Sequence, residues 1–192
     1  MTQPIEKKER YTAEDYFALP EDAHTELIEG KLYKLYGMAP PSFNHQKLVS
    51  EIQWRIISHI KGRGGKCEVM PAPFMVQLKK EKSNYVEPDI SVICDPEKLT
   101  DKGCIGAPDW IIEIVSPSDP GHDYMLKLNL YQAAGVREYW IVDIGNKCIT
   151  ACRLENGIYV STAHSFDDEV KAGIFEDFSI DFSAIKGQLR KE

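Results

Sequence analysis

The alternation of apolar and polar residues predicts a short helix and a β-hairpin at the start of the chain. Thr12 stands at an N-cap position and Asp15 follows three residues later, which is the spacing of a capping box, and Pro20 stops the helix. In residues 25–36 apolar and polar residues alternate on both sides of Glu29-Gly30. This pattern predicts two antiparallel strands joined by a tight turn.

The next apolar pattern has helical spacing. From Ser42 to about Lys61, apolar residues recur every three or four positions, and a Gly-Arg-Gly-Gly sequence then ends the helix. His45 lies on the apolar face. Glu51 and Arg55 form an i,i+4 pair on the other face, so we expect Glu51 to be a surface residue and not a ligand.

The middle of the chain predicts strands separated by turns. Four segments are short and apolar or β-branched, and Pro, Gly or charged residues divide them. These segments are residues 66–72, 73–79, 87–94 and 109–115. A helix with an apolar stripe is expected at about 122–134, and residues 137–143 then return as a strand. A strand, a helix and a strand in this order indicate a parallel βαβ unit covered on at least one face.

The remainder of the chain predicts one more hairpin. Asn156-Gly157 separates two strand-like runs, which is a strong hairpin signal. We expect the last thirty residues to form an edge strand and a tail. The sequence has no internal repeat, low-complexity segment or linker, and 192 residues suit one domain covering residues 1–192.

Composition and charge limit the classes of protein that fit. Hydrophobic residues make up 43% and charged residues 28%, as in soluble globular proteins, and no apolar run reaches the roughly 18 residues of a membrane span. The polar start of the chain has no apolar signal segment, so we expect a cytoplasmic protein without a membrane partner. A net charge of −7 argues against nonspecific coating of nucleic acid, although it leaves room for a local basic groove.

The cysteines predict no covalent framework. The chain has five of them, an odd number, and none forms a CxxC pair, so neither a disulfide framework nor a zinc site is indicated. Cys94 and Cys148 stand in or beside apolar strands, and we expect both to be small buried thiols.

One carboxylate stands inside an apolar run, where an ionised group needs a partner. Glu113 lies within residues 109–115, and Asp89 begins an apolar strand 24 residues earlier. That separation allows two neighbouring strands to bring both carboxylates together, and a divalent cation such as Mg²⁺ would offset their repulsion. Lys127 on the following helix could stabilise charge on a phosphate, and Asp123 one turn earlier could hold the lysine in position.

Each of these residues also has an ordinary structural explanation. Asp89 could satisfy nearby backbone N–H groups at a strand start. Glu113 could form a purely structural ion pair with Lys127, and Lys127 alone could be a solvated helix lysine. Spacing alone does not decide between these explanations and a catalytic site.

Three segments, taken in order, resemble the Uma-type family of restriction endonucleases over roughly residues 11–165. They are YVEPDISVICD, GAPDWIIEIVSPSD and DYMLKLNLYQAAGVREYWIVD. The resemblance implies the α/β fold of PD-(D/E)XK nucleases, a restriction-endonuclease-like central mixed β-sheet flanked by helices, here with an N-terminal hairpin and helix. Asp89 and Glu113 match the two acidic positions. A lysine is expected two residues after Glu113, but Val115 stands there, and in this family the lysine is taken to have moved to the next helix, as Lys127.

Two further residues follow from the resemblance. Glu26 matches the family's N-terminal acidic position, as a further metal ligand or an orienting carboxylate, although it could also be a cross-strand partner of Lys34. His45 matches a helix histidine, although a histidine on an apolar face is often a satisfied core residue. We therefore take Asp89, Glu113 and Glu26 as metal ligands, with Lys127 and His45 completing the catalytic set.

The resulting hypothesis is a Mg²⁺- or Mn²⁺-dependent endonuclease that hydrolyses phosphodiester bonds in DNA. Cutting two strands needs two sites, so resemblance and symmetry together imply a homodimer. The alternative is a catalytically inactive module that keeps the nuclease fold to bind nucleic acid or protein, because a fold alone does not establish activity. The acidic net charge and the displaced lysine favour this alternative.

Overall fold

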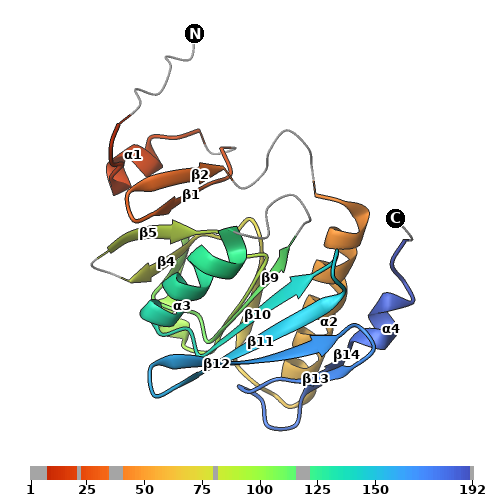
Figure 1. The fold of residues 1–192 in the computed structure, drawn as a ribbon. Coiled ribbons are helices and arrows are strands. Elements are labelled where there is room, and N and C mark those ends of the chain that lie inside the picture. Colours follow the sequence, from red (N-terminus) through yellow and green to blue (C-terminus); the bar gives the residue numbers. More distant parts are fainter. Residues whose placement is uncertain (1–7, 21–22, 35–40, 80–81, 116–121, 191–192) are drawn as a thin grey trace.

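The computed structural model describes residues 8–20, 23–34, 41–79, 82–115 and 122–190 (Figure 1). Its α-helices are α1 Ala13–Phe17, α2 Phe43–Gly62, α3 Leu128–Ala134 and α4 Phe182–Lys186. A 3-10 turn spans Pro96–Lys98, and a π-helical segment, His122–Lys127, leads directly into α3. The helices predicted at about 42–61 and 122–134 are both present. None of the described helices is long and apolar enough to cross a membrane.

The central sheet contains the βαβ unit predicted from the sequence. Its strand order is β12-β11-β10-β9-β6-β3. The bounds are β3 Glu68–Pro71, β6 Ile90–Ile93, β9 Trp110–Val115, β10 Glu138–Asp143, β11 Cys148–Glu155 and β12 Ile158–Ser165. Strands β9 and β10 are parallel and α3 connects them, whereas the other neighbours are antiparallel. The sheet is therefore mixed, as the fold class requires.

A second sheet, which the sequence patterns do not separate from the first, incorporates the N-terminal hairpin. Its order is β2-β1-β5-β4-β8-β7. The bounds are β1 Thr25–Ile28, β2 Lys31–Lys34, β4 Val76–Lys79, β5 Lys82–Val86, β7 Leu99–Thr100 and β8 Gly103–Ile105. The hairpin is not an appendage, because β1 pairs with β5 at Leu27 and Tyr85.

Both tight turns lie where the sequence predicts them. Glu29 and Gly30 have φ angles of 50° and 81°, and Asn156 and Gly157 have φ angles of 51° and 83°. Two consecutive residues with positive φ are the signature of the two-residue turn that matches strand twist. The capping box of α1 is also present, with Thr12 and Asp15 each accepting from the other's backbone N–H.

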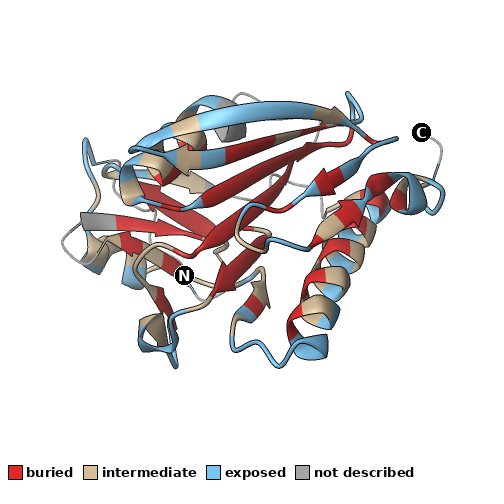
Figure 2. Cartoon of the chain, turned by 90° about the horizontal axis from the view of Figure 1, so that it is seen from below, coloured by how far each residue is buried: buried red, intermediate tan, exposed pale blue. Residues whose placement is uncertain are grey.

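The central strands are buried, as the red colour in Figure 2 shows. Apolar side chains cover both faces of the central sheet. On one face, α2 packs through Leu48, Ile52 and Ile56 against the strands, and the C-terminal elements join the same core. On the other face, α3 and the second sheet pack against Ile111 and Val115 of β9. The central strands are buried from both sides, which explains why they read as nearly continuous apolar runs.

The prediction for the last thirty residues is wrong. Strands β13 Glu169–Lys171 and β14 Ser179–Asp181 form a separate hairpin, and α4 follows it with Asp181 as its N-cap. Phe166, Phe182 and Ile185 are buried in the core beneath α2 and the central sheet. Three elements of three to five residues are too short for their apolar residues to show a helical or strand period. The sequence pattern therefore does not reveal that these residues are buried.

The cysteine prediction is also corrected. Cys67 and Cys94 form a disulfide, so Cys94 is not a free thiol. Glu68 pairs with Ile93 in the antiparallel register of β3 and β6, and one step further this register brings Cys67 opposite Cys94. The number and spacing of the cysteines in the sequence do not show which strands pair, so the disulfide could not be predicted from them. Cys148 takes no part in a disulfide among the described residues, as expected, but it is only half-buried.

A buried carboxylate at the start of β10 predicts a dependence of stability on pH. Glu138 is fully buried and accepts hydrogen bonds from Trp140 Nε1 (2.7 Å) and from the N–H groups of Gly173 (2.6 Å) and Ile174 (2.8 Å). Burial raises the pKa of the Glu138 carboxyl above its ordinary 4.5, although these donors oppose the shift. As pH rises above 4.5, the unfolded chain loses this proton first, so Glu138 makes the free energy of unfolding fall until the folded form also ionises.

We expect Glu138→Gln to remove that decrease, which chemical denaturation at several pH values between 4 and 8 would measure. The variant should also be less stable at every pH, by about 1–3 kcal/mol, because an amide NH₂ would face a donor. Glu155→Gln, an exposed change at the end of β11, is the matched control and should not alter the pH profile. An unchanged profile in Glu138→Gln would contradict the assignment.

Candidate active site

The register of β6 and β9 brings two carboxylates together. Val92 lies opposite Trp110, and Ile90 lies opposite Ile112. One step further, the same register places Asp89 opposite Glu113, and the Asp89 N–H lies 3.5 Å from Glu113 Oε2. The 24-residue separation in the sequence therefore corresponds to direct neighbours across two strands.

Glu113 faces α3 because side chains alternate along β9. Ile112 and Ile114 belong to the core under α2, whereas Ile111 and Val115 belong to the core under α3. Glu113 shares the second face and is 4% exposed. A carboxylate in this apolar run is thus directed at a specific neighbour, and not at the aliphatic core on the α2 side.

That neighbour is a buried lysine. Lys127, at the end of the π-helical segment, is 2% exposed, and its Nζ lies 2.8 Å from Glu113 Oε1. The hydroxyl of Tyr131, one turn further along α3, donates to the same Oε1 at 2.7 Å. Two donors on one oxygen fix the orientation of the Glu113 carboxylate and leave its Oε2 on the Asp89 side.

Glu26 of β1 completes the ion pair from the second sheet. It is fully buried, and its Oε1 lies 3.1 Å from Lys127 Nζ and accepts from the Glu87 N–H at 3.0 Å. Lys127 therefore bridges two carboxylates from two different sheets. In the hairpin register, Glu26 lies opposite Tyr33, and Lys34 lies opposite Thr25.

Asp89 connects the two faces of the central sheet. Its Oδ2 accepts from the Ile114 N–H at 2.7 Å and lies 3.3 Å from Nε2 of His45, on the first turns of α2. The structural explanation of Asp89, a side chain that satisfies a backbone N–H, is therefore realised. It uses one carboxylate oxygen and is compatible with a further role for the other.

A comparison of sequences decides the family. The sequence model of the Uma2 family, described as "Putative restriction endonuclease", matches residues 13–183, which is most of the chain. The protein belongs to the Uma2 family.

Three similar proteins are consistent with this membership. The uncharacterized protein slr1290 of Synechocystis sp. (strain ATCC 27184 / PCC 6803 / Kazusa) is 31% identical over 55% of this chain, and the match spans only 53% of that relative. The uncharacterized protein sll1609 of the same organism is 27% identical over 69% of this chain and 74% of its own length. A crystal structure described as a putative nuclease belonging to DUF820, from Anabaena variabilis ATCC 29413, superimposes with a TM-score of 0.73.

That superposition covers 92% of this chain and 97% of the other, at 21% sequence identity. At this identity the likeness establishes the fold, and it confirms the predicted restriction-endonuclease-like class.

Within the Uma2 fold, the position of the lysine has a simple geometric basis. Val115 stands where a strand lysine is expected, on the same face of β9 as Glu113, and it is 1% exposed. Lys127 reaches Glu113 from α3 across this same face. Asp123 lies in the π-helical segment with a side chain outside the described residues, so its positioning role stays a prediction.

Two site residues were missed from the sequence. Tyr131 is the tyrosine of a Lys-x-x-x-Tyr spacing that the family resemblance contains, and an i+4 position on a helix is the signal that could have placed it beside Lys127. Glu87 directly precedes the Pro-Asp pair. Burial raises the pKa of the Glu87 carboxyl, a shift that His24 opposes and that the charge of Glu26 increases.

We expect Tyr131→Phe to weaken the site without removing it. The variant loses one of the two donors to Glu113 Oε1, in a fully buried position, which should cost about 1–2 kcal/mol of unfolding free energy. Any nuclease activity should fall by roughly tenfold, because Lys127 alone then orients the carboxylate. Thermal denaturation and initial cleavage rates would measure both effects. Tyr159→Phe, which removes a hydroxyl hydrogen bond to the Val136 carbonyl oxygen and none to Glu113, is the control.

The donor set suits a hard divalent cation at two of the three predicted ligands. The carboxylates of Asp89 and Glu113 lie opposite each other. The Ile114 N–H binds Oδ2 of Asp89 and Lys127 binds Oε1 of Glu113, so the second oxygen of each carboxylate is the one considered for a cation. Mg²⁺ in proteins often uses one or two carboxylates and completes its coordination with water and phosphate. Among the described residues, no three His, Cys, Asp or Glu side chains converge on one point. Glu26 as a third ligand stays a prediction.

Proposed function

We propose that the protein is a divalent-metal-dependent endonuclease that hydrolyses phosphodiester bonds in DNA. One observation carries the proposal. Asp89, which directly precedes β6, lies opposite Glu113 of β9, and the buried ammonium of Lys127 lies 2.8 Å from Glu113. Two acidic groups and a lysine are the constituents of the PD-(D/E)XK site, and here they come from three separate elements. Membership of the Uma2 family supports the same conclusion.

In this proposal, the carboxylates of Asp89 and Glu113 would hold Mg²⁺ or Mn²⁺. When bound, the cation supplies Lewis-acid stabilisation of the charge that develops on the scissile phosphate. Ile114 and His45 hold Asp89, and Tyr131 holds Glu113, so both carboxylates are oriented before substrate arrives. Preorganised charges of this kind cost no reorganisation during the reaction.

Lys127 has two functions in the proposal. In the absence of substrate its ammonium neutralises Glu113 and Glu26, which makes two buried carboxylates tolerable. With substrate bound, the same ammonium donates to a phosphate oxygen and offsets the negative charge of the transition state. Glu26 restrains the lysine from the opposite side through its 3.1 Å contact, as an orienting carboxylate does.

The first test is cleavage of supercoiled plasmid and of single-stranded DNA in Mg²⁺, in Mn²⁺ and in EDTA. Wild type should cut in either metal and not in EDTA. Glu113→Gln should cut at least about a hundredfold more slowly, because a neutral amide binds the cation far more weakly than a carboxylate and forms no ion pair with Lys127. Glu51→Gln makes the same chemical change on the surface of α2, where Glu51 pairs with Lys47 and Arg55, and should cut normally. Metal-independent cutting, or normal cutting by Glu113→Gln, would refute the proposal.

A second candidate function, a non-catalytic module that binds nucleic acid or protein, is favoured by one observation. Within the described part of the chain, no three His, Cys, Asp or Glu side chains are grouped as metal ligands would be, and Lys127 is already paired with two carboxylates. Titration calorimetry with Mn²⁺ separates the candidates. Binding that Glu113→Gln abolishes supports the nuclease, whereas absence of any Glu113-dependent binding supports the module.

The assembly and the compartment are also proposals. A homodimer would provide the two sites that a double-strand cut requires, and light scattering after gel filtration measures its mass. The cytoplasm stays the predicted compartment. The Cys67–Cys94 disulfide counts against it, because disulfides are rare in reducing compartments.

A further inference from the structure

A buried asparagine at the start of α2 holds a distant basic residue in place. Asn44 is 6% exposed, and its side-chain amide donates to the Arg190 carbonyl oxygen at 3.0 Å. The carbonyl of the same amide accepts from the Arg190 N–H at 2.8 Å. Both halves of one side chain thus bind the backbone of one residue, 146 positions later in the chain. This contact fixes where the Arg190 side chain begins.

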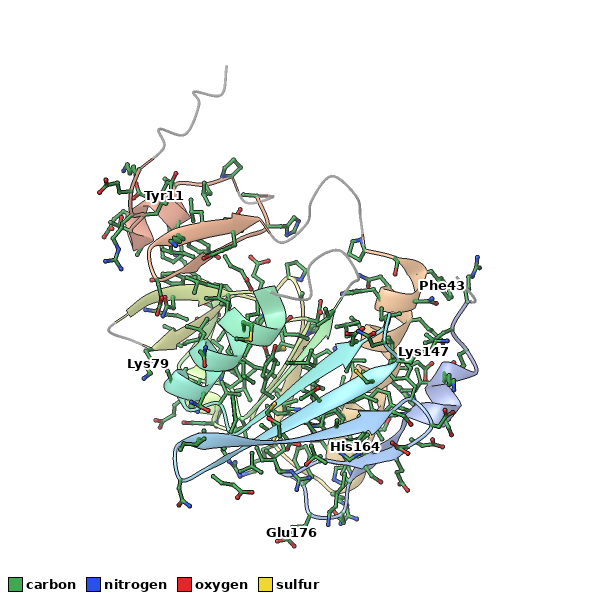
Figure 3. The ribbon with its side chains drawn as sticks, in the orientation of Figure 1. Tyr11, Phe43, Lys79, Lys147, His164 and Glu176 are labelled. Carbon is green, nitrogen blue, oxygen red and sulfur yellow. A yellow bond between two sulfur atoms is a disulfide. The ribbon has the colours of Figure 1, made fainter. Side chains whose placement is uncertain are left out.

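The Arg190 side chain then lies over an exposed aromatic ring. Its guanidinium carbon is 4.5 Å from the centroid of the Phe43 ring, and Phe43, the first residue of α2, is 52% exposed. Figure 3 labels Phe43 at the end of α2, beside the C-terminal part of the chain. Exposure of one ring is ordinary in a soluble protein, but an exposed aromatic ring with a cation held against it offers both a stacking surface and a positive charge to a ligand.

The charge of Arg190 is available to a ligand. Within the described ranges, no carboxylate forms an ion pair with it. Arg63, at the other end of α2, is instead paired with Asp177. The Arg190 guanidinium also lies beside the N-terminus of α2, because Phe43 is the first residue of that helix. The dipole of α2 adds to the positive potential there. A fixed, unneutralised cation is notable in a chain of net charge −7.

This platform is close to the candidate active site. Phe43 precedes His45 by two residues on α2, and His45 Nε2 lies 3.3 Å from Asp89 Oδ2. Two residues correspond to a rise of about 3 Å along the α2 axis, and because residues two apart do not face each other, Phe43 and His45 lie on different sides of the helix start. A strand whose phosphate lies at Asp89 and Glu113 could extend a few nucleotides and reach the ring.

We propose that Phe43 and Arg190 form a binding platform for a single-stranded segment of nucleic acid that leads into the active site. The proposal rests on the proposed function for the identity of the substrate. A base stacks on the part of the Phe43 ring that Arg190 does not cover, and Arg190 contacts the adjacent phosphate, the combination by which proteins bind single strands without reading their sequence. Asn44 is a positioning residue, since it acts only through Arg190.

The test is binding of a fluorescein-labelled 20-nucleotide single strand and of the matching blunt duplex, measured by anisotropy in EDTA so that no cleavage occurs. Phe43→Ala should weaken single-strand binding at least about fivefold and affect the duplex less. Arg190→Gln should weaken binding and lower the slope of log K against log salt by about 0.7, the value for one phosphate contact in a single strand. Asn44→Ala should reproduce the Arg190→Gln effect. Arg63→Gln, the same loss of charge at the opposite end of α2, is the control and should change neither quantity.

Each outcome decides between distinct conclusions. If Arg190→Gln and Arg63→Gln weaken binding equally, only net charge matters and the platform is refuted. If the variants lose melting temperature but keep wild-type affinity and salt slope, the contacts only fasten the C-terminal segment, which also refutes it. If wild type cuts no DNA while Phe43→Ala and Arg190→Gln still lose affinity, the proposed nuclease fails and the platform stands. If wild type cuts in metal while both variants bind normally, the nuclease stands and the platform fails.

Discussion

Replacing Asp89 by Asn should lower metal-dependent cleavage at least about a hundredfold and leave the protein folded. The substitution keeps the shape of the side chain and one carbonyl oxygen, which can still accept from the Ile114 N–H now 2.7 Å from Asp89 Oδ2. It removes the negative charge that would hold the cation beside Glu113. The variant therefore tests the catalytic role of Asp89 separately from its structural role, because the hydrogen bond from the Ile114 N–H is kept and the charged ligand of the cation is lost.

The measurement is the initial rate of plasmid nicking in Mg²⁺ and in Mn²⁺, with thermal denaturation of the same samples. Asp95→Asn provides a closely matched control. Asp95 stands just beyond the other end of β6, is exposed, and caps the 3-10 turn through the Glu97 N–H at 3.0 Å. It should cut like wild type. Normal cutting by Asp89→Asn would show that the carboxylate is only a strand-start acceptor.

Lys127→Met should have the largest effect on stability of any change in the site. Methionine fills similar space but leaves Glu26 and Glu113 buried without their cation, in a position where the lysine side chain is 3% exposed. Removing one partner of a buried ion pair typically costs about 3–5 kcal/mol of unfolding free energy. Cleavage should be lost as well, since the phosphate loses its cationic donor.

Two further variants separate the structural loss from the catalytic one. Lys47→Met breaks a surface i,i+4 pair with Glu51 on α2 and should cost less than about 1 kcal/mol, by the same denaturation experiment. Lys127→Met combined with Glu26→Gln removes one buried charge, so it should recover part of the lost stability and remain inactive. Recovery of cleavage in that double variant would show that Lys127 serves only to neutralise Glu26.

The features that could be predicted from the sequence are those written in local patterns. The turns at Glu29-Gly30 and Asn156-Gly157 need only the conformational freedom of two adjacent residues, and both are present. Helix α2 needs only a sustained apolar period along one segment. The juxtaposition of Asp89 and Glu113 was also accessible, because their separation suits neighbouring strands.

The missed features depend on contacts between distant segments. The Cys67–Cys94 disulfide follows from the register of β3 and β6, which no cysteine count contains. The second sheet depends on pairing between β1 and β5, some sixty residues apart in sequence. Tyr131 acquires its role only because α3 packs with Lys127 directed at Glu113. Pairing and packing of this kind are tertiary properties, which local propensity does not encode.

The displaced lysine has a consequence for how such sites can be found. Val115 and Glu113 share one face of β9, and Lys127 enters the space over that face from α3. The site therefore requires an ammonium group at a point in space, and any element that packs over this face can deliver it. A search that demands a lysine two residues after the acidic strand position will overlook such proteins. A search that fixes the two acidic positions and accepts a lysine from the next helix would recover them.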